Sequence, residues 1–280
     1  MKKYKFSFIA LFVCIMLSTC RPKIVTDVKV PKTDPQLVLF SFLSPEDAVI
    51  EVVLTISNPV FGTTYYYQSN IVNDAYVTIS NSSGQIIQIP FNSDLGKYRI
   101  SQSAFTIVPS QTYTITASSK GLLAMGTTSV PKSIINFDKV SGKLGSNSSQ
   151  GDPMVVLNYS WQDEAAIKNY YRISFEDNIR FNGVDSSGTP IGDEFFKDIN
   201  RDGNLISGQY EYDGYFDPGT EQRVNLYLLN TDIHYYEYHS RRVVYSGDDP
   251  FSEPFQQYSN VTSGLGVVCS YRLSKSSCTF

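Results

Sequence analysis

AVIEVVLTIS, residues 48–57, is the stretch that decides the fold class. Its apolar side chains Ile50, Val52 and Leu54 fall at every second position, with Glu51 between two of them. A period of two places alternate side chains on opposite faces of an extended chain, so the stretch predicts a β-strand with one buried face.

Short runs of the same kind flank this stretch and end at turn-forming residues. About seven strands in roughly 95 residues predict a β-sandwich over residues 37–131, of immunoglobulin-like or transthyretin-like type. The other runs are LVLFSF (37–42), AYVTIS (75–80), QIIQIP (85–90), GKYRIS (96–101), QTYTITAS (111–118) and GTTSVP (126–131).

A second β-rich region follows a change in composition. Residues 132–152 become rich in Gly, Ser and Asn, and we interpret them as a linker made of an inter-domain strand and a flexible loop. Alternation then resumes, and Trp161 is expected to anchor a second core within residues 153–280. The runs are MVVLNYSWQD (154–163), NYYRISFED (169–177), QYEYDGYF (209–216) and RVNLYLLN (223–230).

One segment of this second region has helical features. We predict a helix near 231–246, with Thr231 as its cap and Asp232 in its first turn. Arg241 and Arg242 near its end complement the helix dipole. The predicted fold class is therefore mostly β: an N-terminal sandwich followed by a β-rich domain with one helix.

Composition excludes several classes of protein. The chain has 280 residues, of which 41% are hydrophobic and 18% charged, which suits a folded protein better than a disordered or multi-span membrane chain. The formal net charge of −4 argues against a nucleic-acid partner, because such proteins carry basic surfaces.

The first twenty residues, MKKYKFSFIALFVCIMLSTC, predict export. Three lysines precede an apolar run of 12 residues, Phe6 to Leu17, which is too short for a stable membrane anchor. The run ends at Leu17-Ser18-Thr19-Cys20, which resembles the lipobox of bacterial lipoproteins. We therefore predict a signal peptide at 1–19, lipidation of Cys20 and a tether at 20–36; the alternative is a secretory signal with an incidental cysteine.

Two further cysteines lie near the C-terminus. Cys269 and Cys278 flank YRLSKSS, which we interpret as a strand-turn-strand. A disulfide across this hairpin suits an oxidising compartment, and two free thiols are the alternative.

The sequence carries few signs of catalysis. The two histidines, His234 and His239, are five residues apart, which does not place them on one helix face, and no nucleophile, P-loop or dinucleotide motif is present. We predict a non-enzymatic protein without a required cofactor. A secreted hydrolase, which we rank below binding roles, would need two carboxylates facing each other in a cleft.

One polar cluster matches a calcium loop in part. Asp198, Asn200, Asp202 and Asn204 place oxygen atoms at alternate positions with Gly203 sixth, although Gln209 stands where a bidentate Glu is expected. The alternative is a tight polar turn, because Asp, Asn and Gly favour such turns.

A run of tyrosines is the other candidate site. Tyr65, Tyr66 and Tyr67 lie in a predicted loop, where exposed rings suit binding of glycans or proteins. The alternative is that they pack one face of a strand.

The C-terminal region carries a family resemblance. GDDPFSEPFQQYSNVTSGLGVV (247–268) resembles the signature of a Bacteroidetes lipoprotein family, catalogued as domain of unknown function 4249. NDAYVTISNSSGQ (73–85) and GKYRIS (96–101) are similar to elements of its first domain, and the tyrosine-containing helix looks like the family's helix. We interpret the D-P-F-S-E-P segment as structural, with a partner-binding surface as the alternative.

The resemblance implies a lipid-anchored protein of the outer membrane that assists uptake. Members look like outer-membrane lipoproteins often encoded beside TonB-dependent, SusC-like transporters, so the expected partner is such a transporter. A surface glycan- or peptide-binding module is the alternative. The residues after the lipidated cysteine, Arg21 to Val25, are not acidic, which leaves surface and periplasmic orientation both open.

Overall fold

Strands dominate the structure of this chain. The computed structural model describes residues 34–58, 70–147, 153–181, 183–185, 188–214, 220–244 and 257–280. Most of these residues lie in strands, and there is one α-helix among them, which confirms the predicted mostly-β fold class. The elements are β1 (Leu37–Leu43), β2 (Val49–Ile56), β3 (Tyr76–Asn81), β4 (Ile86–Gln88), β5 (Phe91–Asn92), β6 (Lys97–Ser101), β7 (Thr112–Ser119), β8 (Leu122–Ser129), β9 (Phe137–Asn147), β10 (Pro153–Gln162), β11 (Tyr170–Phe181), β12 (Val184–Asp185), β13 (Thr189–Lys197), β14 (Leu205–Asp213), β15 (Thr220–Thr231), α2 (Ile233–Val244), β16 (Val261–Thr262) and β17 (Leu265–Thr279).

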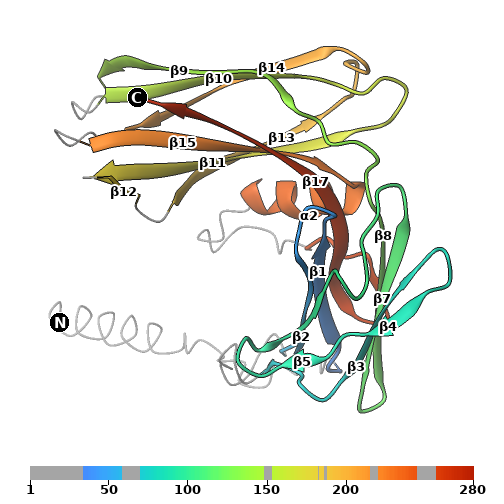
Figure 1. Cartoon of the computed structure of the whole chain (residues 1–280). Helices are drawn as coiled ribbons and strands as arrows, with labels where there is room; N and C mark the ends of the chain where they lie inside the picture. The colour runs from blue at the N-terminus through green and yellow to red at the C-terminus, as the bar shows by residue number, and fades with distance from the viewer. Residues whose placement is uncertain are drawn as a thin grey trace, which may run out of the picture. The chain divides into compact units, whose positions relative to one another are not determined.

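The strands form three sheets (Figure 1). The largest has nine strands in the order β12-β11-β15-β17-β1-β2-β6-β5, and β13 also pairs with β11. A five-stranded sheet runs β16-β8-β7-β3-β4, and a three-stranded sheet runs β14-β10-β9. Strands far apart in sequence are therefore neighbours, most notably β1 and β17, which pair in parallel.

The first core has the alternation that the sequence predicts. On β2, Ile50, Val52 and Leu54 are buried, whereas Glu51 is only partly covered. The three buried side chains of β2 pack with Ile79 of β3 and other buried side chains of the five-stranded sheet. One face of each sheet is therefore removed from water.

The second core is built on aromatic rings. Trp161 of β10 is fully buried, as predicted, with its ring centroid 5.3 Å from that of Tyr171 and 5.2 Å from that of Phe196. Within the predicted linker, residues 137–147 form β9, which pairs with β10; residues 148–152 lie outside the described part.

Strand β17 contributes to both cores. Its first half pairs with β1 and places Val268 in the first core, and its second half pairs with β15 and places Cys278 against the second. Figure 1 shows this strand, in red, passing from β1 to β15. The described residues from Pro35 onward accordingly form one compact unit, and the sheets cross the boundary predicted between residues 131 and 153.

The predicted C-terminal hairpin is wrong. YRLSKSS lies inside β17, which is continuous from Leu265 to Thr279. Serines usually favour turns, but here each residue of the run is held in a ladder with β15, so tertiary pairing overrides local preference.

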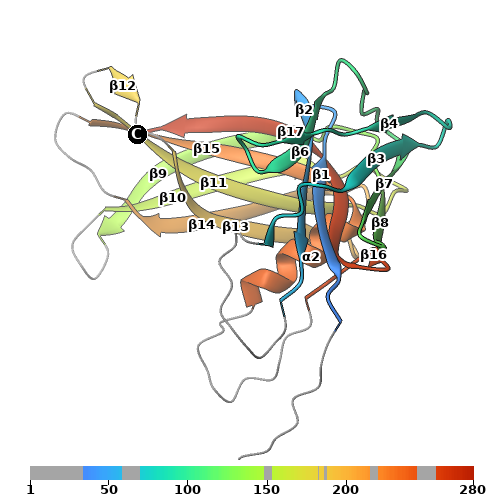
Figure 2. The ribbon, with the colours of Figure 1, turned by 90° about the horizontal axis from the view of Figure 1, so that it is seen from below.

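Helix α2 packs on the outer face of the nine-stranded sheet, on the side away from β9, β10 and β14 (Figure 1). Figure 2 shows the same helix from below. Its Tyr235 and Tyr238 are buried against Leu229, Val267 and Cys269, forming a third apolar cluster. In the described part of the chain, no helix combines the length and apolarity needed to cross a bilayer.

The helix cap differs from the prediction. Asp232, rather than Thr231, caps α2, because its Oδ1 accepts a hydrogen bond from the Tyr235 backbone N–H at 2.8 Å. Thr231 is still part of β15, and its hydroxyl donates to the Tyr170 carbonyl oxygen at 3.2 Å. The strand continues one residue further than the sequence pattern indicates, which moves the cap by one position.

Candidate functional site

Several residues predicted to carry function lie outside the described part of the chain. They are Cys20, Tyr65, Tyr66, Tyr67 and the D-P-F-S-E-P segment at 249–254. Lipidation of Cys20 and ligand binding by the three tyrosines therefore stay predictions.

The predicted disulfide between Cys269 and Cys278 is wrong. Both are free cysteines, and both lie on β17. Nine residues of one extended strand separate their Cα atoms by about 30 Å, whereas a disulfide needs roughly 4.4–6.8 Å. Cys269 is fully buried, and burial raises the pKa of its thiol well above the usual value, so it is an inert core residue.

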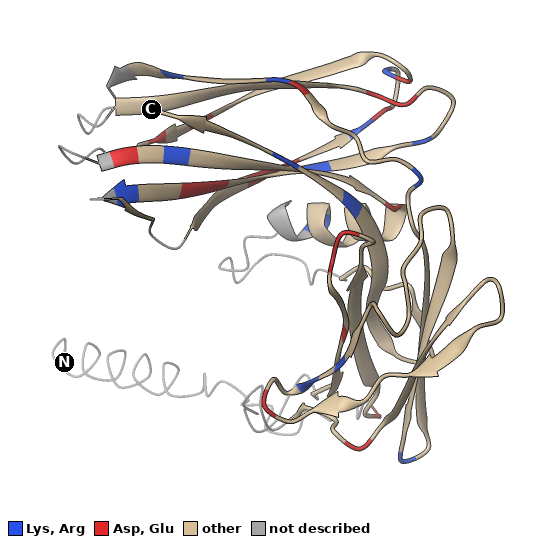
Figure 3. Cartoon of the chain, viewed as in Figure 1, with Lys and Arg blue, Asp and Glu red and all other residues tan. Residues whose placement is uncertain are grey.

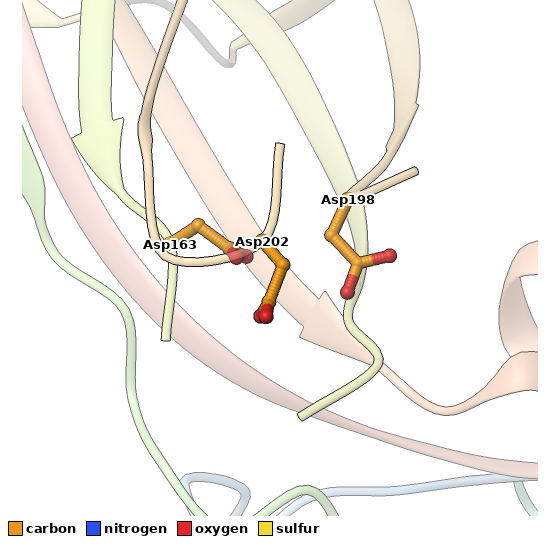
Figure 4. A group of neighbouring side chains, drawn as sticks. All are labelled: Asp163, Asp198 and Asp202. Atoms are coloured by element: carbon orange, nitrogen blue, oxygen red, sulfur yellow. The ribbon is translucent and has the colours of Figure 1, made fainter. Parts of the chain in front are cut away.

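The predicted calcium loop is only partly reproduced. Asp198 and Asp202 come together with Asp163, which follows β10, so that ligand atoms of all three lie within 4.8 Å of one another (Figure 4). Asn200 and Asn204, the other two predicted ligands, are exposed. Asp163 could not be found from the sequence, because it lies 35 positions before Asp198 and approaches it only through the sheet.

The same carboxylates also hold the local backbone together. Asp163 accepts hydrogen bonds from Tyr171 Oη at 2.6 Å and from the Gly203 N–H at 2.8 Å. Asp198 accepts from the Asn169 N–H, and Asp202 from the Ala166 N–H, both at 2.8 Å. The segment thus functions as a turn in its own right, and calcium binding stays a prediction.

One cavity lies on the outer face of the nine-stranded sheet, beside α2. We call it the α2 pocket; its volume is about 370 Å³. Alternation in the strands explains its lining, because β11 and β15 bury every second side chain in the second core and turn the others outward. The lining residues are Phe42, Arg172, Ser174, Tyr227, Leu229, Tyr235, His239, Tyr271 and Leu273.

Arg172 is the permanently charged residue of this lining, and it is held on three sides. Its Nε and Nη2 donate to the two oxygens of Asp193 at 2.9 and 2.8 Å, and its Nη1 donates to Tyr235 Oη at 2.6 Å. Burial disfavours its charge, but the interactions with Tyr235 and Asp193 outweigh burial and raise the pKa of Arg172. The guanidinium therefore stays charged, locally neutralised and fixed in place.

Two tyrosines of the pocket are tied to carboxylates. Tyr227 Oη donates to Glu176 at 3.1 Å, and Tyr271 Oη donates to Asp47 at 2.9 Å. Burial raises the pKa of Tyr271, and partial burial followed by its bond to Glu176 raises the pKa of Tyr227, so both hydroxyls remain protonated. Their oxygens keep a lone pair for a ligand.

A second cavity of about 360 Å³ adjoins the α2 pocket and shares Phe42 and Tyr271 with it. Asp47 and Glu51 also line it. Both Glu51 oxygens are occupied, one by Lys97 at 2.7 Å and the other by Arg99 at 3.2 Å. Burial raises the pKa of Asp47 despite its bond to Tyr271.

The charged side chains near these cavities are mixed in sign. Figure 3 shows acidic and basic residues interspersed along β11 and β15 rather than gathered by sign. Long-range steering of a strongly charged ligand is therefore not a property of this face.

The histidines of α2 have separate environments. His239 lines the α2 pocket, with its ring 4.3 Å from the Tyr235 ring and 5.5 Å from the Phe42 ring. His234 Nδ1 instead lies 2.6 Å from Tyr258 Oη. These separate surroundings agree with the expectation from their spacing that the two histidines do not lie on one helix face.

Sequence patterns contained a partial signal for the pocket. Alternation alone places Arg172, Ser174 and Glu176 on the face of β11 opposite the core. The contributions of β1, β17 and α2 could not be predicted, because they depend on the parallel pairing of β1 with β17.

The C-terminal motif has a structural role where it is described. Asn260 donates to the carbonyl oxygens of Thr127 at 3.0 Å and Val268 at 2.7 Å, and its Oδ1 accepts from the Val268 N–H at 2.9 Å. It thereby ties β16 and β17 to β8. Asn260 therefore satisfies backbone groups of β8 and β17.

Comparison with known proteins supports the resemblance. No curated protein matches this sequence. The family described as domain of unknown function (DUF4249) matches residues 25–277, which is nearly the whole chain. The chain therefore belongs to the DUF4249 family.

Proposed function

We propose that this protein is a non-enzymatic, lipid-anchored protein of the outer membrane that assists a TonB-dependent, SusC-like nutrient transporter. The α2 pocket is the observation that carries the binding role, because it combines a recess of about 370 Å³ with aromatic walls and fixed polar groups. The lipobox-like sequence ending at Cys20 supports the anchor. The transporter partner follows from the resemblance of the chain to outer-membrane lipoproteins.

The carboxylates around the cavities favour binding over hydrolysis. A glycosidase needs one carboxyl group as the acid and a second as base or nucleophile. Glu51 and Asp193 have both oxygens engaged by cations, and Asp47 is the acidic residue of the two cavity linings without such a partner among the described residues. Glu176 lies outside both linings, and its Oε1 accepts hydrogen bonds from Tyr227, Asn225 and Asn178. Among the described residues, the two linings therefore contain one carboxyl group without a cation, rather than the facing pair that a glycosidase requires.

The anchor is tested by fractionation of cells that express the full chain. The wild type should sediment with outer membranes and show a fatty-acylated Cys20 by mass spectrometry. The Cys20→Ala variant should leave the membrane fraction, whereas Cys278→Ala, a matched cysteine change, should not. An unmodified Cys20 thiol in the wild type would overturn the anchor.

The partner is tested by co-purification. A tagged full chain, extracted from outer membranes in mild detergent, should bring down a TonB-dependent transporter identified by mass spectrometry. Recovery of the tagged chain alone, after cross-linking in intact cells, would contradict the accessory role.

A surface glycan- or peptide-binding module is the second candidate, and the same pocket favours it. The Tyr65–Tyr67 run is the other place where such a module could hold its ligand. Replacement of these three residues by alanine should reduce ligand retention if the run forms the site, and Phe42→Leu should reduce it if the α2 pocket does. Retention that survives both changes excludes both sites.

A further inference from the structure

The charges of the α2 pocket select against a charged ligand. An anion would have to compete with Asp193, which already holds Arg172 through two hydrogen bonds at 2.8 and 2.9 Å. A cation would approach Arg172 itself and would find no carboxylate among the described residues that line this pocket. A neutral ligand neither competes with Asp193 for Arg172 nor is repelled by the charge of Arg172.

The floor of the pocket offers side chains but no open backbone. Leu229 of β15 pairs with Arg172 of β11 on one side and with Leu273 of β17 on the other, and Phe42 of β1 pairs with Cys269 of β17. The backbone of Leu229 is therefore used on both sides within the sheet, and on the side of β17 away from β15 the Leu273 N–H donates to Glu46 Oε2 at 3.2 Å. A peptide bound by strand addition needs free backbone groups along a strand, and this N–H is already held by a side chain.

The aromatic walls are inclined to one another. The Phe42 and Tyr235 rings meet at 79°, the Tyr235 and Tyr271 rings at 57°, and the Phe42 and His239 rings at 44°. Their centroids are 6.1, 5.6 and 5.5 Å apart, so the rings touch one another and a ligand rests on them rather than between them. A flat aromatic ligand cannot lie face to face on rings that are inclined in this way. Inclined rings suit a puckered ring that presents C–H groups on several sides.

The polar atoms of the walls occur as both donors and acceptors. The hydroxyl oxygens of Tyr227 and Tyr271 donate to carboxylates and can still accept. Tyr235 Oη accepts from Arg172 and can still donate its own hydrogen, and Ser174 Oγ can do either. Hydroxyl groups of a ligand, which also donate and accept at one atom, match this set. The volume of about 370 Å³ lies near the lower end of the roughly 300–1,000 Å³ typical of small-molecule sites.

From these four observations, we infer that the α2 pocket binds a neutral carbohydrate, with one sugar ring packed against Phe42 and Tyr271 and its hydroxyl groups bonded to Tyr227, Tyr235 and Ser174. The inference rests on the binding role proposed above, but it does not depend on the identity of the transporter.

The test uses the lipidated full chain in a polyoxyethylene detergent, because sugar-based detergents would compete for the site. The probes are glucose, galactose, mannose, xylose, maltose and cellobiose, with glucuronate and glucosamine as charged counterparts of glucose. Saturation-transfer NMR should show ring C–H contacts for at least one neutral sugar. Titration calorimetry should give that sugar an affinity at least about tenfold higher than the affinities of glucuronate and glucosamine.

Two variants locate the binding in the pocket. Phe42→Leu removes a ring, and Ser174→Leu fills the recess; each should weaken sugar binding by about tenfold or more. Tyr76→Leu is the matched control, because Tyr76 is an aromatic residue of β3 that is 58% exposed and lies outside the pocket. Circular dichroism and Trp161 fluorescence check that each variant is folded.

Three outcomes would overturn the inference: no signal from any neutral sugar, tighter binding of glucuronate or glucosamine, or binding that both pocket variants leave unchanged. Co-purification of a transporter without sugar binding would refute the ligand and preserve the accessory role. Sugar binding without co-purification of a transporter would preserve the ligand and refute the accessory role.

Discussion

Two glycines at the start of β17, Gly264 just before the strand and Gly266 within it, determine how closely this strand approaches its neighbours. Gly266 has φ +112°, and a Cβ there would overlap the carbonyl oxygen of Leu39 on β1. A Cβ on Gly264 would lie 2.6 Å from the Leu37 carbonyl oxygen. The G-L-G element of the family resemblance therefore has a steric explanation, since the parallel pairing of β1 and β17 requires these positions to lack a side chain.

We expect Gly266→Ala to destabilise the fold strongly. The matched control is Gly84→Ala, because Gly84 also has a positive φ, +85°, but no atom lies within 4 Å of the point that a Cβ there would occupy. The control should cost about 1 kcal/mol from backbone strain, and Gly266→Ala roughly 2 kcal/mol more from overlap with Leu39. Equal losses in urea unfolding would contradict the close-approach explanation.

Asp232 is a buried carboxyl group at the start of α2. Thr128 Oγ1 donates to it at 2.5 Å and the Tyr235 N–H at 2.8 Å, yet burial outweighs these bonds and raises its pKa from 3.8 to about 7. The folded state thus holds a proton that the unfolded chain has already released. Protonation of Asp232 therefore stabilises the folded state. This stabilisation is complete below pH 3.8 and is lost as the pH rises to about 7.

We expect Asp232→Asn to remove this loss. An amide keeps the cap acceptor but carries no charge, so the variant should gain stability relative to wild type between pH 4 and 7, up to a limit of about 4 kcal/mol. Urea unfolding at several pH values measures the difference. His234 contributes the opposite slope in both proteins, because burial lowers its pKa, and it cancels in the comparison. A constant difference across this range would contradict the prediction.

At the level of elements, the turn between β13 and β14 shows how two functions can share one segment. Its backbone closes through the Arg201 N–H to the Asp198 carbonyl oxygen at 2.6 Å and the Asn204 N–H to the Arg201 carbonyl oxygen at 2.9 Å. Asp163 and Asp198 are nevertheless both buried acidic residues in one group with Asp202. A cation would offset their mutual repulsion.

The calcium prediction requires that metal removal destabilise the protein. Addition of calcium after EDTA treatment should raise the melting temperature, by an amount equivalent to about 2.7 kcal/mol at a hundredfold excess over Kd. Asp202→Asn should abolish this response, whereas Asp94→Asn, at an exposed residue of another turn, should retain it. A midpoint that neither calcium nor EDTA changes would assign the segment to a hydrogen-bonded turn alone.

For the whole molecule, the shared strand β17 has consequences for cooperativity. Val268 belongs to the first core and Cys278 packs against the second, with one continuous strand between them. Loss of the first core would remove the pairing of β1 with β17 and expose the strand that supports β15. The described part of the chain should therefore unfold as one unit.

A core mutation far from the single tryptophan tests this coupling. Ile115→Ala in the first core should cost about 2–5 kcal/mol, because Ile115 is fully buried. The unfolding transition reported by Trp161 fluorescence in the second core should shift by the same amount as circular dichroism. Leu123→Ala, at a residue that is 44% exposed, should shift neither the fluorescence transition nor the circular dichroism transition. A Trp161 transition that stays in place would indicate two independent domains.

The sequence by itself determined the fold class, most strand positions and the burial of Trp161, because a strand's alternation is a local property written in consecutive side chains. The helix was also found, with its cap displaced by one residue. Only the tertiary structure decided that residues 265–279 form one strand, that Cys269 and Cys278 are far apart, and that Asp163 joins Asp198. The tertiary structure also determined which residues line the α2 pocket. The pairing of β1 with β17 joins residues more than 200 positions apart, and no local pattern encodes such a contact.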